Sequence, residues 1–257
     1  MKRIDSVILH RSQTAERTAM NKTIYITMDM DWANDDVLAD SVSLAEQLKI
    51  PVCLFVTNDT PLLQILRQHP LYTLGIHPNF LPQLNGQTTK SYRDTIAEML
   101  KIVPEAKIIR CHALVDATPV LVTARELGFR ADMNLFIPFS SGIPLQSFRH
   151  FSGLKRLPFF YEDDAWALEP GHPAPEQHIP VSGDTLCIFN FHPIHLYLNT
   201  ENMERYNRAK PYYHEFEKLA PYVNHGEGFG ARDFLLRIKQ LADENNIRFG
   251  KVEELWN

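Results

Sequence analysis

Short apolar runs rich in β-branched and aromatic residues alternate along this chain with longer segments of helical period. The run 23–28 predicts a buried strand. Apolar residues at every third or fourth position predict an amphipathic helix over 35–48, capped by Asp35 and closed by Pro51. The other predicted strands span 52–57, 71–77, 107–113, 129–137, 154–160, 185–192 and 248–252, and the other predicted helices span 61–68, 92–102, 118–127 and 231–244.

The order of these elements predicts an α/β fold. Strands and helices alternate through the first half, and each connection is long enough for a crossover helix, which is typical of parallel βαβ units. A barrel and a doubly wound open sheet both fit this order. The 257 residues suit one large core. We therefore expect one domain over 21–257, preceded by an extension at 1–20, with an irregular proline-rich surface loop at 169–181.

Composition and charge narrow the range of partners. The chain has 22% charged residues, a net charge of −5 and no basic cluster, so a nucleic-acid partner is not expected. No apolar run approaches the ~20 residues of a membrane span, and the N-terminus lacks the apolar core of a signal peptide, so we expect a cytoplasmic protein without a membrane span. The cysteines are widely separated, and we expect Cys53 and Cys187 to be free, buried thiols.

Polar side chains unsuited to a core occur where the predicted strands end. In α/β barrels the carboxyl ends of the strands build the active site, so this distribution favours the barrel over the open sheet. Four different strands contribute. The residues concerned are Asp29 and Asp31, His77, Arg110 and His112, and Asn190 and His192.

The pair Asp29 and Asp31 is the most informative part of this set. Side chains on a strand alternate between faces, so both carboxylates are expected on one face, about 7 Å apart. They repel each other unless a cation lies between them or one is protonated. A metal ligand beside a general base satisfies both conditions, whereas the simpler alternative is that both aspartates cap the following loop and helix.

The same alternation places Arg110 and His112 on one face, and Asn190 and His192 on one face. An arginine in this position can hold a carboxylate and keep it ionised, as a base such as Asp29 requires. Three histidines opposite two aspartates fit zinc or another first-row divalent ion better than magnesium or calcium.

Other candidates near these strand ends are less distinctive. His195 follows Pro193 in a predicted loop, and we interpret it as a rim residue. Trp32 and Trp166 either stack on a sugar face or serve in packing, and the sequence does not decide between these roles. The segment 203–213 mixes aromatic and charged residues and fits a lid, an interface or a solvated helix.

Several of these motifs resemble the polysaccharide deacetylase family, the NodB-like carbohydrate esterases with a distorted (β/α)7 barrel. The resemblance is greatest to the WbmS-type branch associated with O-antigen gene clusters, and it runs from about residue 23 to the last helix. ITMDMDW, LGIHPNF, RCHAL and FNFHP match four motifs, and DDAW matches a fifth loosely. The likeness implies Asp29 as base, Asp31 and His77 as metal ligands, Arg110 as the partner of the base, and His192 as general acid.

The sequence departs from the family pattern at the second metal histidine. That position is Leu81, and His112, two residues after Arg110, is our candidate for the missing ligand. The residues we expect to bind substrate are Trp32, Asn79, Asp164, Trp166 and Asn190.

The resemblance implies hydrolysis of an N-acyl group, acetyl or formyl, on a sugar in surface-polysaccharide biosynthesis, with a divalent metal that we predict to be zinc. A cytoplasmic location would make the substrate a nucleotide sugar or a lipid-linked oligosaccharide. One alternative is a metal hydrolase for another C–N amide bond, which would release ammonia rather than acetate. Another is a barrel that binds carbohydrate without catalysis, motivated by Leu81. The sequence does not indicate the oligomeric state.

Overall fold

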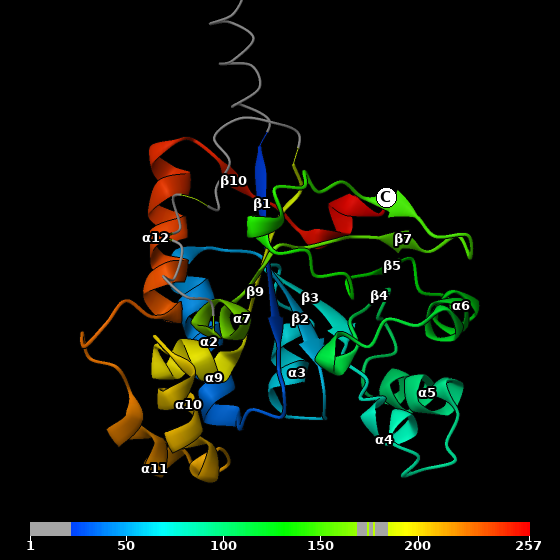
Figure 1. The fold of residues 1–257 in the computed structure, drawn as a ribbon, viewed down its shortest axis with the longest axis horizontal. Helices are drawn as coiled ribbons and strands as arrows, with labels where there is room; N and C mark the ends of the chain where they lie inside the picture. Colours follow the sequence, from blue (N-terminus) through cyan, green and yellow to red (C-terminus); the bar gives the residue numbers. More distant parts are fainter. Residues whose placement is uncertain (1–21, 169–173, 175–176, 178–184) are drawn as a thin grey trace, which may run out of the picture.

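The computed structural model describes residues 22–168, 174, 177 and 185–257 (Figure 1). The predicted extension at 1–20 and most of the proline-rich stretch 169–181 lie outside these residues. The strands are β1 Thr23–Asp29, β2 Val52–Val56, β3 Tyr72–Ile76, β4 Ile108–Ile109, β5 Ala131–Asp132, β6 Phe148–Arg149, β7 Lys155–Arg156, β8 Tyr161–Glu162, β9 Cys187–Phe191 and β10 Arg248–Phe249.

Helices surround these strands in the described part of the chain. The α-helices are α2 Asp35–Leu48, α3 Leu62–Leu66, α4 Leu81–Leu84, α5 Tyr92–Ile102, α6 Thr118–Glu126, α7 Asp163–Leu168, α9 Pro193–Leu198, α10 Met203–Ala209, α11 Phe216–Leu219 and α12 Ala231–Glu244. The short 3-10 turns are η1 His112–Leu114, η2 Phe139–Ser141, η3 Lys210–Tyr212, η4 Ala220–Tyr222 and η5 Val252–Leu255.

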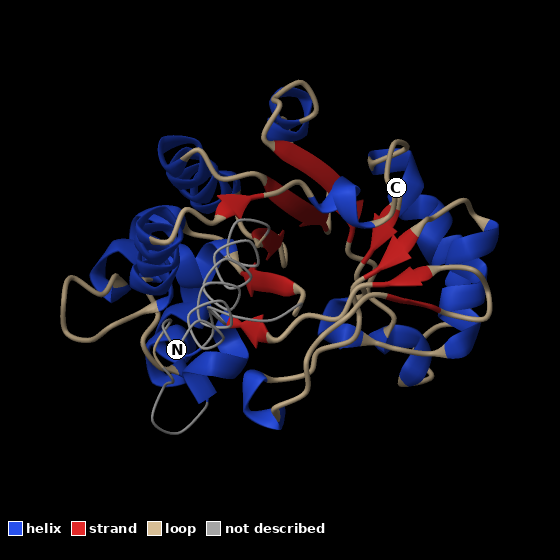
Figure 2. Cartoon of the chain, turned by 90° about the horizontal axis from the view of Figure 1, so that it is seen from above, coloured by secondary structure: helices blue, strands red, loops and turns tan. Residues whose placement is uncertain are grey.

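The strands form one ten-stranded sheet with the order β6-β7-β5-β4-β3-β2-β1-β9-β8, and β10 also pairs with β1. Neighbouring strands are parallel except for β6 and β7. Seen from above, the sheet is strongly curled, with the helices on its outer side (Figure 2). The predicted α/β fold with a distorted barrel is therefore confirmed.

Alternation along each strand separates an outer core from the barrel interior. On β1, Ile24, Ile26 and Met28 belong to the large cluster shared with the helices, whereas Tyr25 belongs to a smaller interior cluster. The same parity puts Asp29 on the inner side, at the carboxyl end of the strand. The interior cluster is built by Tyr25, Cys53, Phe55, Ile108, Ala131, Met133, Leu157, Phe159, Ile188 and Val252.

Several strands are shorter than predicted because the chain leaves the sheet at the level of the site. The predicted strand 107–113 is reduced to β4, and the chain then enters η1, in which Ala113 has a left-handed φ of 53°. His112 is thus not on a strand, and the expectation that alternation places it on one face with Arg110 is wrong. Beyond β4 the side-chain oxygen of Asn134 accepts the Cys111 N–H (2.6 Å), so a side chain replaces the strand-to-strand hydrogen bond.

The cap of α2 also differs from the prediction. Asn34, not Asp35, is the N-cap, and its side-chain oxygen accepts the N–H of Val37 (2.9 Å). Asp35 instead accepts a hydrogen bond from the Thr60 hydroxyl (2.6 Å), which ties α2 to the loop after β2.

Two further expectations can be compared with the described residues. All three cysteines are free and buried, as predicted for Cys53 and Cys187. In the described part of the chain, no helix combines the length and the apolar character needed to cross a bilayer.

Candidate active site

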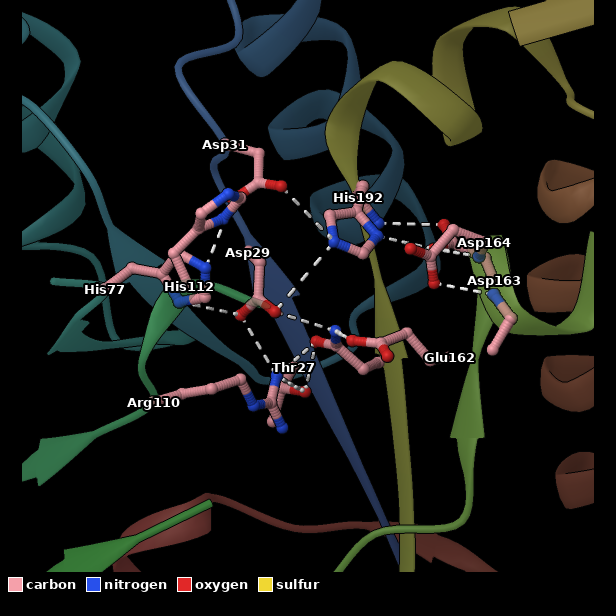
Figure 3. Close-up of polar contacts among 12 residues, drawn as sticks. Thr27, Asp29, Asp31, His77, Arg110, His112, Glu162, Asp163, Asp164 and His192 are labelled. Carbon is pink, nitrogen blue, oxygen red and sulfur yellow. Dashed lines mark hydrogen bonds and ion pairs between the residues drawn. The ribbon is translucent and has the colours of Figure 1, made fainter. Parts of the chain in front are cut away.

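The carboxyl ends of the parallel strands bring the predicted polar residues into one neighbourhood (Figure 3). Asp29 is the last residue of β1, while His77 directly follows β3 and His192 directly follows β9. His77 Nδ1 lies 3.7 Å from Asp29 Oδ1, and His192 Nε2 lies 4.0 Å from Asp29 Oδ2 and 3.7 Å from Asp31 Oδ2. Residues from three strands, distant in sequence, therefore face the same space.

Asp31, His77 and His112 form a group able to hold a divalent cation. Asp31 Oδ1 lies 3.1 Å from both His77 Nε2 and His112 Nδ1, and one ligand atom from each residue lies within 4.8 Å of the others. Burial would raise the pKa of Asp31, but hydrogen bonds from His112 and His77 outweigh it and leave the pKa below its usual range. An ionised carboxylate beside two imidazoles is a donor set suited to zinc and similar ions.

A strained turn presents Asp31 to this group. Asp31 and Trp32 both have left-handed backbones, with φ of 43° and 57°, which costs roughly 1 kcal/mol or more for each such residue. The turn is held by the Trp32 N–H, which donates to Thr57 Oγ1 (3.0 Å), and by the Tyr213 hydroxyl, which donates to the Asp31 carbonyl oxygen (2.8 Å). The aspartates thus do not merely cap the following helix.

Arg110 binds the Asp29 carboxylate through a buried ion pair. Its guanidinium is fully buried between the rings of Phe55 and Phe159, with Cζ 4.5 and 4.3 Å from the ring centres. Nη1 donates to Asp29 Oδ1 (3.0 Å), and Nε donates to the Met133 carbonyl oxygen (3.1 Å). Burial would raise the pKa of Asp29, but Arg110, with smaller contributions from His77 and His192, lowers it below its usual value.

Asn190 links Asp29 to a second buried carboxyl group. The Asn190 amide donates to Asp29 Oδ2 (2.9 Å) and to Glu162 Oε1 (3.0 Å), while its oxygen accepts from Thr27 Oγ1 (2.7 Å) and from Arg110. Asn190 is fully buried and both polar atoms of its side chain are used within the protein, which favours a role in positioning Asp29 over direct contact with substrate.

Glu162 is a residue that the sequence analysis missed. It ends β8 and is 8% exposed. Burial, reinforced by the charge of Asp164, raises its pKa to about 8. The signal that could have found it is an acidic residue two positions after a predicted strand, directly before the DDAW motif.

Asp163 orients His192. One Asp163 oxygen lies 2.6 Å from His192 Nδ1, and the other accepts the His192 backbone N–H (2.8 Å). The contact places the Nδ1 proton toward Asp163 and leaves Nε2 facing the two aspartates. Burial would lower the pKa of His192, but the charge of Asp163 raises it well above its usual value. Asp164, which we expect from the sequence to bind substrate, has a side-chain oxygen that accepts the N–H of Ala165 (2.6 Å).

The remaining predicted substrate residues differ in exposure. Trp32 is 36% exposed, and its ring lies edge-on to His112 with centroids 4.9 Å apart. Asn79 is half-buried, and its side-chain oxygen accepts the N–H of Leu81 (2.9 Å). Trp166 is 3% exposed and packs edge-on against Phe234 (5.4 Å), which favours the packing role of the two that the sequence left open.

His195 is not a rim residue in a loop, as we had expected. Pro193 begins α9, a favourable position for proline, and the helix carries His195 into the interior, where it is 4% exposed. Its Nδ1 lies 3.0 Å from Thr200 Oγ1, and its ring lies 4.8 Å from the Tyr206 ring. The His195 ring thus lies between His192, whose ring centroid is 5.6 Å away, and Tyr206 of α10.

Comparison with known proteins agrees with this geometry. The model of the WbmS-like polysaccharide deacetylase family matches residues 26–210. The chain belongs to this family. A solved structure assigned as a WbmS polysaccharide deacetylase involved in O-antigen biosynthesis, from Bordetella bronchiseptica, is 33% identical and has a TM-score of 0.78. The match covers 85% of this chain and 90% of that chain.

More distant structures share the fold of this WbmS-like domain. A peptidoglycan N-acetylglucosamine deacetylase is 12% identical with a TM-score of 0.51, and the match covers 95% of each chain. A 4-alpha-glucanotransferase from Thermococcus litoralis is 11% identical with a TM-score of 0.51, covering 91% of this chain and 37% of that chain. No curated protein sequence matches the WbmS-like chain significantly.

Proposed function

We propose that this protein is a metal-dependent deacetylase that hydrolyses an N-acyl group, acetyl or formyl, on a sugar of a surface polysaccharide. The observation that carries the proposal is an ionised Asp29, fixed by the buried Arg110, beside the Asp31–His77–His112 group. The family membership supports the class of reaction. The O-antigen role ascribed to the Bordetella relative supports the class of substrate.

Asp31, His77 and His112 would hold the cation, with His112 in the role that Leu81 cannot fill. Leu81 begins α4 and has no ligand atom, whereas η1 brings the His112 ring to within 5.5 Å of the His77 ring. Two imidazoles and one carboxylate favour zinc. A bound cation of this kind polarises the scissile carbonyl and makes water more acidic.

The chain's own residues divide the proton transfers. Asp29 takes a proton from the attacking water, since Arg110 keeps its carboxylate ionised and Asn190 fixes its second oxygen. Water oxygen bonds to the acyl carbon, and the C–N bond breaks. His192 Nε2 then protonates the departing sugar nitrogen, because Asp163 stabilises the imidazolium and directs Nε2 toward the site. The products are a carboxylate and a free amine on the sugar.

Replacing Asp29 with Asn tests the assignment of the base. Asn cannot take the proton, so acetate release from an N-acetylated sugar should fall by at least ~100-fold. Zinc stoichiometry should be unchanged, because Asp29 lies outside the ligand group. Acetate and ammonia are both measured, since ammonia would indicate a different amide substrate.

The matched control is Asp36→Asn, which removes a carboxylate from the exposed side of α2. It should retain wild-type activity. A D29N protein that binds zinc and releases acetate at the wild-type rate would contradict the role given to Asp29. Nucleotide sugars and lipid-linked oligosaccharides are the two substrate forms to compare.

A further inference from the structure

A pocket of about 510 Å³ opens directly beside the proposed metal group. Its wall on one side is the Asp31–Trp32 turn, and its other wall is the segment from α10 to α11, which lies beside α9 at one end of the molecule (Figure 1). Asp31, Trp32, Tyr206, Lys210, Tyr213 and His214 are among the residues that line it. We call it the Lys210 pocket.

A hydrogen bond joins the two walls, and one wall packs on a buried side chain. The Tyr213 hydroxyl donates to the Asp31 carbonyl oxygen (2.8 Å), so the α10–α11 segment is attached to the turn that carries a proposed ligand. Tyr206 packs on the buried His195, with ring centroids 4.8 Å apart. The pocket therefore has a fixed position relative to the site of hydrolysis.

The lining combines an aromatic surface with a free cation. Trp32 is partly exposed and offers a ring on which a sugar can stack. The Lys210 ammonium lies 5.6 Å from the centre of the Tyr206 ring, and it forms no ion pair with any carboxylate of the described residues. Glu215, also in the lining, is already paired with Lys218 (2.5 Å), so Lys210 is left to attract an external anion.

We propose that the Lys210 pocket is a specificity subsite that binds an anionic part of the substrate, a phosphate or a carboxylate, through Lys210, with the adjoining sugar on Trp32. The inference rests on the proposed deacetylation and defines its substrate as an acidic glycan or a glycosyl phosphate. The sequence allowed the segment 203–213 to be a lid, an interface or a solvated helix. In this proposal it forms one wall of the substrate site.

Three probes that all contain N-acetylglucosamine separate the sources of the negative charge. Chitotetraose is neutral, UDP-N-acetylglucosamine carries phosphates, and a hyaluronan tetrasaccharide carries carboxylates. Affinities of the zinc-loaded full chain are measured by calorimetry, and acetate release from each probe is measured separately.

Lys210→Gln should weaken binding of at least one anionic probe about tenfold and change chitotetraose binding less than twofold. Raising the salt concentration should weaken the same probe in the wild type but not in K210Q. Loss with UDP-N-acetylglucosamine alone identifies phosphate, and loss with the hyaluronan fragment alone identifies carboxylate. Lys101→Gln, which removes the same charge from the exposed side of α5 outside the pocket, should leave all three affinities unchanged.

The proposal is overturned if the wild type binds neither anionic probe, if K210Q affects neither, or if K210Q weakens all three probes equally. A different experimental result would show that the deacetylase assignment is wrong. In that case the wild type would bind an anionic probe in a Lys210-dependent manner and yet release no acetate from any probe.

Discussion

At the scale of single residues, the candidate active site contains two buried carboxyl groups, Asp29 and Glu162, whose pKa values are displaced in opposite directions. Asp29 accepts a hydrogen bond from the Arg110 guanidinium, and its pKa is lowered. Glu162 accepts a hydrogen bond from the neutral Asn190 amide, and burial, reinforced by the charge of Asp164, raises its pKa to about 8. The pairing with a buried cation, rather than burial alone, decides which group is ionised at neutral pH.

The raised pKa of Glu162 makes stability depend on pH. In the unfolded chain a glutamate ionises near pH 4.5, whereas the folded protein keeps this proton until about pH 8. The folded state thus binds more protons between these values, and the free energy of unfolding falls as pH rises through this window. The loss attributable to Glu162 is up to about 5 kcal/mol.

Glu162→Gln isolates this contribution, because glutamine resembles the protonated acid and can still accept from Asn190. Urea unfolding at pH 5, 7 and 8.5 should show E162Q gaining stability over the wild type as pH rises. Glu217→Gln, on the exposed side of α11, should follow the wild-type curve. A difference between E162Q and wild type that stays constant with pH would refute the assignment.

At the scale of the elements, close packing of neighbouring strands positions the arginine that holds the base. Gly75 in β3 faces the barrel interior, where a Cβ atom would lie 2.8 Å from the Phe55 ring and 2.9 Å from the Ile108 side chain. Phe55 in turn packs on the guanidinium of Arg110. The absence of a side chain at Gly75 therefore leaves room for the aromatic ring that supports Arg110.

Gly75→Ala should overpack this contact and displace Phe55. We expect a loss of about 1–3 kcal/mol in the free energy of unfolding, with reduced acetate release because Arg110 shifts under Asp29. Gly228→Ala is the control, since its Cβ would meet only the flexible side chain of Glu201 (3.2 Å). If G75A kept wild-type stability and activity, the interior would accommodate the added methyl group and close packing at Gly75 would not position Phe55.

At the scale of the whole molecule, the proposed cation binds side chains from three different loops that follow strands of the sheet. Asp31 follows β1, His77 follows β3 and His112 follows β4, so the ligand group exists only in the folded chain. A ligand that binds the folded state alone raises the free energy of unfolding by about 2.7 kcal/mol when its concentration is a hundred times Kd.

Adding zinc to the metal-free protein at that excess should therefore raise Tm by about 5–10 °C. Asp31→Asn should abolish most of this shift, which differential scanning calorimetry measures. His69→Gln, at a half-buried histidine that precedes β3 and so lies at the opposite end of that strand from His77, should keep the full shift. An equal zinc shift in wild type and D31N would place the cation elsewhere.

The sequence predicted the architecture well and the detailed site less well. The pattern of continuous apolar runs predicted β1 and β2, because both faces of these strands are buried. It overextended the strand at 107–113, since a side chain of Asn134 replaces the backbone partner there. It also missed α9, in which Pro193 starts a helix, and so misplaced His195.

The motif spacing by itself determined that Asp29, Asp31, His77 and His192 stand at strand ends, because a local pattern of apolar residues fixes where each strand stops. Only the tertiary structure decided that Asp163 orients His192, that Glu162 reaches Asn190, and that His112 meets Asp31 across 81 residues of sequence. Those contacts depend on the curl of the sheet and on turns such as η1, where side-chain hydrogen bonds and left-handed backbones replace periodic structure. The period of apolar residues in the sequence does not predict such turns. Tertiary packing is what brings their side chains to the candidate active site.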